Sequence, residues 1–117
     1  MHVPAVRRIV AASVLVSLVA WAPTAFAQAE RYTDWGSVQE LEAGWVLDAM
    51  AVRHSAPMVN PGGCSVTNAG YATNPADAGH SLFHTLLLSA FLNRKEVALL
   101  VSGCAFDKPR IISVKIR

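Results

Sequence analysis

The sequence predicts a small, mostly β domain with one helix, arranged as a five-stranded barrel of the OB type. The expected elements run in the order strand, strand, strand, helix, strand, strand, which is the element order of an OB-fold. The only two cysteines, Cys64 and Cys104, both lie within this region. Residues 1–27 have the pattern of an export signal, and exported cysteines normally oxidise, so we expect one disulfide between them.

The N-terminus has the layout of a bacterial secretory signal peptide. Arg7 and Arg8 form a short basic region, and the apolar run IVAASVLVSLVAWA covers Ile9–Ala22. Ala25 and Ala27 then supply the small residues of an A-x-A cleavage site. This order of basic, apolar and small residues predicts cleavage after Ala27.

A transmembrane anchor is the alternative to cleavage. The apolar run is shorter than the ~20 residues that span a bilayer, and Pro23 interrupts it. We therefore expect removal of residues 1–27 and a chain that is periplasmic or secreted from a bacterium, with no membrane span left. Removal takes away Arg7 and Arg8, which leaves eight basic residues against eight acidic ones. A neutral chain without a Lys/Arg cluster argues against nucleic acid as a partner.

The processed chain is expected to form one domain. Residues 28–35 are interpreted as a short lead-in, and residues 36–117 as a single small OB-like domain. The first strand is predicted over Ser37–Glu42 and the second over Trp45–Arg53, joined by a tight hairpin. A helix is the alternative for the second run because Ala, Leu and Met favour it, but the glycine before it and its valines favour a strand.

A loop rich in proline and glycine, SAPMVNPGG, separates the second strand from the third. The third strand is predicted to begin at about Cys64 and to cover the segment CSVTNAGYA. A second loop, TNPADAG, follows at residues 73–79, and its Asn-Pro step disfavours helix there.

One helix is predicted over Gly79–Asn93. Asp77 or Ser81 can cap its start, and Asn93 suits a left-handed cap at its end. Apolar residues at helical spacing form a wide stripe that would close one end of the barrel, with Leu86 and Leu87 buried. The stripe consists of Leu82, Phe83, Leu86, Leu87, Ala90 and Phe91.

Two strands complete the chain. The segment EVALLVSG, residues 96–103, is apolar on both faces and is expected to be central in the sheet. The segment RIISVKIR, residues 110–117, alternates apolar and polar residues, as a half-buried strand does. Asp107, Lys108 and Pro109 are expected to form the turn between them.

Two histidines four residues apart, His80 and His84, share one face of the predicted helix. Zinc hydrolases with this spacing carry a glutamate after the first histidine as general base, but here Ser81 occupies that place. A third ligand is not implied by spacing, although His54 or Asp77 could approach. We expect a structural helix, no catalytic residues and no cofactor. A metal site on His80 and His84 is the alternative.

Three aromatic residues near strand ends are candidates for ligand contact, because aromatic faces stack on sugar rings. Packing in the core is the favoured interpretation for Trp45, since large apolar side chains are usually buried. For Trp35 and Tyr71 the sequence leaves ligand binding and packing equally open.

Residues 35–117 resemble a known family. The resemblance rests on the opening strand GSVQEL, on Cys64 after a Pro/Gly loop, on the run FHTLLLSAFLNRKEVALLVSGC, and on the closing strand PRIISVKI. With these motifs the chain resembles the secreted B subunits of bacterial toxins that have one A and five B subunits. It is most similar to the subtilase-cytotoxin B subunits and their small uncharacterised relatives.

The resemblance implies an OB-fold with one disulfide, a pentamer, and sugar-binding sites on the outer face of the barrel. Toxin subunits of this type contact sialic acid with a serine just before the glycine of the opening strand. Trp35 precedes Gly36 here, so that contact does not carry over. The expected function is an exported, non-catalytic module that binds glycan or protein and forms homo-oligomers. The alternative is a small exported hydrolase or metal-binding protein that uses His80 and His84.

Overall fold

The structure is a computed structural model that describes residues 2–5, 10–21 and 29–117. Within these ranges, all helices and strands lie between Glu30 and Ile116, and residues 2–5 and 10–21 contain neither. Ala25 and Ala27, which form the predicted cleavage site, lie outside the described residues. The predicted class, mostly β with one helix and one disulfide, is confirmed.

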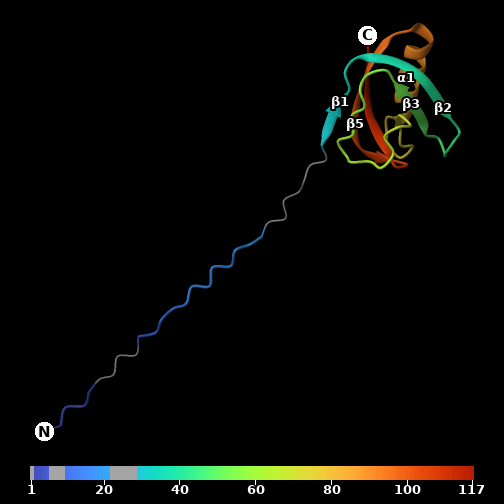
Figure 1. Cartoon of the computed structure of the whole chain (residues 1–117). Coiled ribbons are helices and arrows are strands. Elements are labelled where there is room, and N and C mark those ends of the chain that lie inside the picture. The colour runs from blue at the N-terminus through green and yellow to red at the C-terminus, as the bar shows by residue number, and fades with distance from the viewer. Residues whose placement is uncertain (1, 6–9, 22–28) are drawn as a thin grey trace.

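One helix, α1, lies between the fourth and fifth strands along the chain (Figure 1). The described strands are β1 (Glu30–Tyr32), β2 (Gly36–Ala43), β3 (Met50–His54), β4 (Tyr71–Ala72), β5 (Glu96–Ala105) and β6 (Lys108–Ile116), and α1 spans His80–Asn93.

Five of the strands pair in a closed cycle. β5 pairs with β2, β2 with β3, β3 with β4, β4 with β6, and β6 again with β5. The pairing of β4 with β6 is parallel, whereas the other four are antiparallel. Each strand of the cycle therefore has a neighbour on both sides, which leaves few unpaired backbone groups at its edges.

β1 is a strand that the sequence did not predict. It comes from the expected lead-in and pairs antiparallel with β5, with Arg31 opposite Val101. The buried Thr33 fixes the chain just after it, because its backbone N–H donates to the carbonyl of Leu99 at 2.9 Å. Its hydroxyl in turn accepts from the Leu99 N–H at 3.0 Å. The lead-in is therefore part of the folded sheet.

The second strand is shorter than predicted because its first residues form a turn. β3 begins only at Met50, and the Ala49 N–H closes a turn on the carbonyl of Val46 at 3.1 Å. Leu47 takes a left-handed backbone conformation, with φ 44°, which a strand does not allow. Trp45 is half-buried at this turn and is not a member of the hydrophobic core, in contrast to its expected packing.

The third strand is also shorter than predicted. Only Tyr71–Ala72 is a strand, and the preceding residues form a loop. The amide of Asn60 holds this loop, since its Nδ2 donates to the Cys64 carbonyl at 3.0 Å and its Oδ1 accepts from the Cys64 N–H at 2.8 Å. These contacts satisfy the backbone of Cys64 without a neighbouring strand.

The predicted disulfide is confirmed. Cys64 in the loop is bonded to Cys104 at the end of β5, with Cα atoms 5.7 Å apart. The same region is tied to the turn between β5 and β6, because the Val66 N–H donates to the carbonyl of Asp107 at 2.9 Å. The long loop before β4 is thus attached to the far end of the β5–β6 pair.

The helix matches its predicted bounds to within one residue, but its caps differ. Gly79 is the N-cap, and neither Asp77 nor Ser81 caps the helix with its side chain. At the other end Arg94, rather than Asn93, takes the left-handed position with φ 52°, and its backbone N–H donates to the carbonyl of Ala90. Backbone groups alone therefore close both ends.

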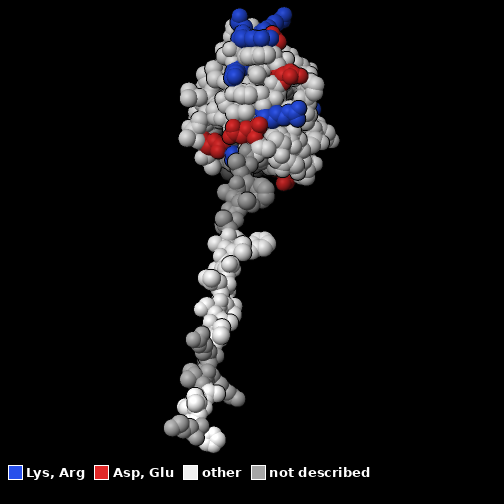
Figure 2. Space-filling view, turned by 90° about the vertical axis from the view of Figure 1, so that its left-hand side faces the viewer, with Lys and Arg blue, Asp and Glu red and all other residues white. Residues whose placement is uncertain are grey.

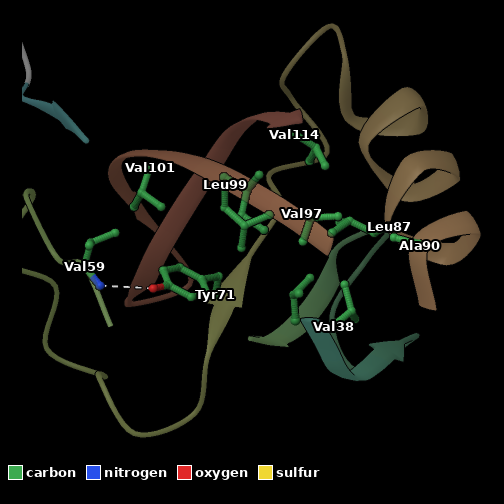
Figure 3. Packing of buried hydrophobic residues seen from close by; sticks show 11 residues of the cluster. Val38, Val59, Tyr71, Leu87, Ala90, Val97, Leu99, Val101 and Val114 are labelled. Atoms are coloured by element: carbon green, nitrogen blue, oxygen red, sulfur yellow. Dashed lines mark hydrogen bonds between the residues drawn. The ribbon is translucent and has the colours of Figure 1, made fainter. Parts of the chain in front are cut away.

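The helix buries only part of the predicted apolar stripe. Leu87 and Ala90 are fully buried and point from α1 toward the strands, where Val97 and Val38 lie (Figure 3). Phe83 and Leu86, also of the stripe, pack against this core, whereas its Leu82 is 69% exposed and its Phe91 is 44% exposed.

Gly70 is required by the close approach of the loop to β3. Its φ of +76° is strained for any side chain, and an added Cβ would overlap the carbonyl oxygen of Val52. We expect Gly70→Ala to destabilise the protein by about 2–3 kcal/mol in urea unfolding. Gly63→Ala is the matched control: its φ is +63°, but a Cβ there meets open space, so it should cost about 1 kcal/mol. Equal costs would contradict the close approach.

Candidate functional site

A polar hollow of ≈140 Å³ lies where β2, β3 and the loop before β4 meet. Polar side chains from three segments surround it, and an apolar floor lies beneath them. Its lining residues are Gln39, Arg53, His54, Ala56, Met58, Thr67, Asn68, Gly70 and Tyr71. We call this site the polar hollow.

Arg53 is the cation of the polar hollow. Its Nε lies 3.5 Å from Glu40 Oε1, and its NH1 donates to the carbonyl of Asn68 at 3.4 Å. Both contacts are long, and the side chain is half exposed, so they hold the guanidinium loosely. A guanidinium has five donors in a planar fork, which leaves several for a carboxylate or a hydroxyl of a ligand.

His54 lies beside Arg53 at the end of β3. Its Nε2 is 3.0 Å from the carbonyl oxygen of Val97, which can only accept, so Nε2 carries the proton. Nδ1 is then an acceptor, and it is buried without a hydrogen-bond partner among the described residues. Gly36 makes room for the ring, because a Cβ there would lie 2.9 Å from His54 Cε1. Nδ1 is thus shielded from solvent, and Arg53 is the charged group that the hollow offers to a ligand.

Tyr71 forms part of the floor of the polar hollow and is also a core residue. It is 1% exposed, and its hydroxyl accepts a hydrogen bond from the Val59 N–H at 3.0 Å (Figure 3). Burial raises the pKa of the Tyr71 phenol, and the bond from Val59 opposes this only in part. The ring is therefore held in place by packing, and at 1% exposure Tyr71 is a core residue that borders the hollow.

Trp35, the other aromatic candidate, lies elsewhere. It is half-buried and does not line the polar hollow. The guanidinium of Arg117 lies over its ring, with Cζ 4.3 Å from the ring centroid, and also pairs with Glu96 at 3.4 Å. A sugar could stack on that face of Trp35 only by displacing Arg117.

His80 and His84 line a second hollow, of ≈440 Å³, with Asp48 and Leu47 from the turn after β2. Their ring centroids are 5.6 Å apart and the rings are nearly perpendicular, at 80°. Each ring is held through one nitrogen. His80 Nδ1 lies 3.0 Å from the carbonyl oxygen of Asp77, and His84 Nε2 lies 2.7 Å from Thr73 Oγ1. The two histidines are therefore neighbours, as their spacing predicted.

The third ligand that the sequence left open is not found at this pair. His54 lines the polar hollow instead, and the carboxylate of Asp77 lies 3.7 Å from Arg110. Within residues 2–5, 10–21 and 29–117, no group of three or more His, Cys, Asp or Glu side chains is placed to hold a metal ion. The histidine pair alone would leave two of the four positions around a tetrahedral zinc to water.

The contact between His84 and Thr73 joins the helix to the end of β4 and, through Thr73, to β3. Thr73 is fully buried, and its Oγ1 accepts from the backbone N–H of Met50 at 2.9 Å. The hydroxyl group of Thr73 can then donate its own proton to His84 Nε2. Nε2 accepts this hydrogen bond only when the imidazole is neutral. Burial lowers the pKa of His84, and nearby His80 lowers it further, while Asp48 acts in the opposite direction.

This contact predicts a loss of stability in mild acid. Because the pKa of His84 is lower in the folded protein than its ordinary 6.5, the unfolded chain binds more protons below pH 6.5. The free energy of unfolding should therefore fall as the pH drops from about 7 to 5. Urea unfolding at a series of pH values measures this pH dependence of the free energy of unfolding. In His84→Gln, the contribution of His84 to that dependence should disappear. An unchanged slope in the variant would contradict the assignment.

No match is found for this chain among protein-family models, curated proteins or solved structures. The likeness to toxin B subunits therefore rests on the sequence motifs alone. In the described part of the chain, no helix is both long and apolar enough to cross a bilayer.

Sequence reasoning identified Tyr71 and the histidine pair, and named His54 as a possible metal ligand, but it did not predict the polar hollow or the role of Arg53 in it. Arg53 and His54 stand at the end of a predicted strand, and Asn68 stood inside another. They meet only because the segment before β4 is a loop that folds back onto β3. The one available signal was the doublet of Arg53 and His54 at a strand end, where polar side chains commonly carry function.

Proposed function

We propose that this protein is an exported, non-catalytic binding module whose ligand is a glycan bound in the polar hollow. The observation that carries the proposal is the loosely held, half-exposed guanidinium of Arg53 among the polar residues that line the hollow. At ≈140 Å³ the hollow is smaller than the ~300–1,000 Å³ pockets of drug-sized ligands, which suits one sugar residue. The fork of Arg53 favours an acidic sugar, since guanidinium pairs bidentately with carboxylate.

The fold supports this proposal at the level of architecture. The closed cycle of five strands, with α1 between the third and fourth of them, is the arrangement expected of an OB-type barrel. The resemblance to toxin B subunits adds two further proposals, a sugar site on the outer face and a homo-oligomer, which in that family is a pentamer. The alternative ligand at the same surface is a protein. A glycan screen would distinguish the two kinds of ligand.

Charge distribution supports a partner other than nucleic acid. On the face shown in Figure 2, acidic and basic side chains lie close together in small groups, and uncharged surface separates one group from the next. Such mixed charges do not form the basic stripe on which a phosphate backbone would bind.

A glycan array with the exported protein tests the function. We expect binding to glycans that end in an acidic sugar, and a loss of at least about tenfold in affinity in Arg53→Gln, as for charged hydrogen bonds. Arg31→Gln is the control, because Arg31 is exposed on β1 and does not line the hollow. An unchanged glycan affinity in Arg53→Gln would mean that the ligand binds elsewhere. The mass of the protein in solution separately tests whether it forms an oligomer.

Export itself is tested by N-terminal sequencing of the protein recovered from outside the cytoplasm. We expect the chain to begin at Gln28, directly after Ala27. Retention of residues 9–22 in the recovered protein would favour the membrane anchor and remove the basis for an exported module.

A metal-binding protein or small exported hydrolase is the second candidate. His80 Nδ1 donates to the carbonyl oxygen of Asp77, and ligand histidines are commonly oriented in this way. Zinc titration followed by metal analysis tests this candidate. Stoichiometric zinc that is lost in both His80→Ala and His84→Ala would move it to first place.

A further inference from the structure

A third concave surface lies between the C-terminal end of α1 and the start of β2. Its volume is ≈550 Å³, within the range of ligand pockets. It shares no lining residue with the polar hollow. Ser37, Val38, Ala90, Phe91 and Leu92 form its floor and walls, and Arg94 and Lys95 lie at its rim. We call it the amphipathic groove.

Apart from Ser37, the side chains of the floor and walls of the amphipathic groove are apolar. Val38 and Ala90 are buried beneath it, whereas Phe91 is 44% exposed and Leu92 is 68% exposed. The helix offers no charged side chain to shield them, since the segment HSLFHTLLLSAFLN contains no Asp, Glu, Lys or Arg. A surface helix normally carries charged residues on its outer face, so this composition leaves apolar surface exposed at the groove, as at interaction sites.

The rim of the groove is positively charged and unpaired. Arg94 and Lys95 form no ion pair or ring contact with any described residue. Most other cations of residues 29–117 have such a partner: three arginines contact carboxylates, and Lys108 and Lys115 lie over aromatic rings. No acidic residue lines the groove. Two free cations beside an apolar surface match a ligand with an apolar body and an anionic head.

We infer that the amphipathic groove binds an anionic amphiphile with an aliphatic chain and a carboxylate head group. The chain lies on Val38, Phe91 and Leu92, and the head group lies between Arg94 and Lys95. This site is independent of the glycan site, so either function can fail while the other holds.

Calorimetric titration of the exported protein with decanoate, below its micelle concentration, tests the site. We expect saturable binding of one decanoate per chain with a Kd of about 100 µM, as the ligand efficiency of small molecules allows. In a groove open on one side, each CH₂ should contribute about twofold, so hexanoate should bind about tenfold more weakly. The absence of saturable binding below 2 mM, about twentyfold above the expected Kd, would overturn the proposal.

The head group is tested with decanoyl-N-methylglucamide, which has the same chain and no charge. It should bind about tenfold more weakly than decanoate, and the double variant Arg94→Gln/Lys95→Gln should lose about the same factor for decanoate. The double variant Arg31→Gln/Lys115→Gln removes the same charge away from the groove and should leave the affinity unchanged. Equal affinity for the two amphiphiles would contradict recognition of the carboxylate.

Two leucines of α1 provide a matched test of the apolar wall. Leu92 lines the groove and is 68% exposed, while Leu82 is 69% exposed and does not line it. Leu92→Ser should weaken decanoate binding about fivefold, and Leu82→Ser should not change it. Equal effects would mean that the amphiphile coats the helix without a site. If sedimentation shows an oligomer and decanoate gives no heat, a second copy covers the groove and the proposal is wrong.

Discussion

Replacement of either cysteine by serine should destabilise the protein by about 2–5 kcal/mol, as for small secreted domains that lose a disulfide. The bond closes a segment of 40 residues, for which the chain-entropy model gives about 4 kcal/mol. Cys64 and Cys104 belong to the same cross-link, so Cys64→Ser and Cys104→Ser should cost nearly the same. Urea unfolding of both variants and of the unreduced protein measures the effect.

Reduction of the wild-type protein is the control for this prediction. A reductant breaks the same bond without a substitution, so it should lower the free energy of unfolding by a similar amount. Asn60 still bonds both backbone groups of Cys64, and Val66 still donates to Asp107, so the loop should keep its native contacts in the folded state. Two free thiols in freshly isolated protein, or a stability that does not respond to reductant, would contradict the disulfide.

Segments with strong local signals were predicted closely. The helix was placed to within one residue because an apolar stripe and flanking Gly, Asn and Pro residues mark its ends. β5 and β6 were also predicted, each to within two residues at either end, because their apolar patterns extend over eight or more residues.

Elements that depend on distant partners were not predicted. β1 has three residues and exists because Glu30–Tyr32 meets β5 in the fold. β4 is reduced to two residues because Asn60 and the disulfide hold the preceding segment as a loop. Neither fact has a local sequence signature, since the β1–β5 pairs join residues 68 to 72 apart and the disulfide joins residues 40 apart.

The candidate sites show the same difference between features with a local sequence signal and features that depend on distant residues. The proximity of His80 and His84 follows from helix geometry and was visible in the sequence. The polar hollow requires Arg53 and Asn68 to meet across the loop, and the amphipathic groove requires the end of α1 to lie beside Val38 of β2. Such sites become visible only when the fold brings segments from different parts of the chain together.

Truncation of one leucine on α1 should reveal which face of the helix forms the core. Leu87 is 0% exposed and lies next to Val97 and the other buried residues of β5 (Figure 3). Leu87→Ala removes buried methyl groups and leaves a hole that the closed cycle of strands can fill only in part. We expect a loss of about 2–5 kcal/mol in the free energy of unfolding.

Leu88→Ala is the matched control, because it makes the same change of residue one position further along the same helix. Leu88 is 48% exposed and does not belong to the core, so its truncation should cost no more than about 0.5 kcal/mol. Both variants gain the same helix propensity from alanine, so the difference between them measures burial alone. The slope of the urea transition should stay constant in both, as two-state unfolding requires. If Leu88→Ala instead cost as much as Leu87→Ala, the face of α1 that is exposed in the single chain would be buried in solution. Contact between copies of the chain would bury it in this way, and the helix would then stabilise an assembly as well as the domain.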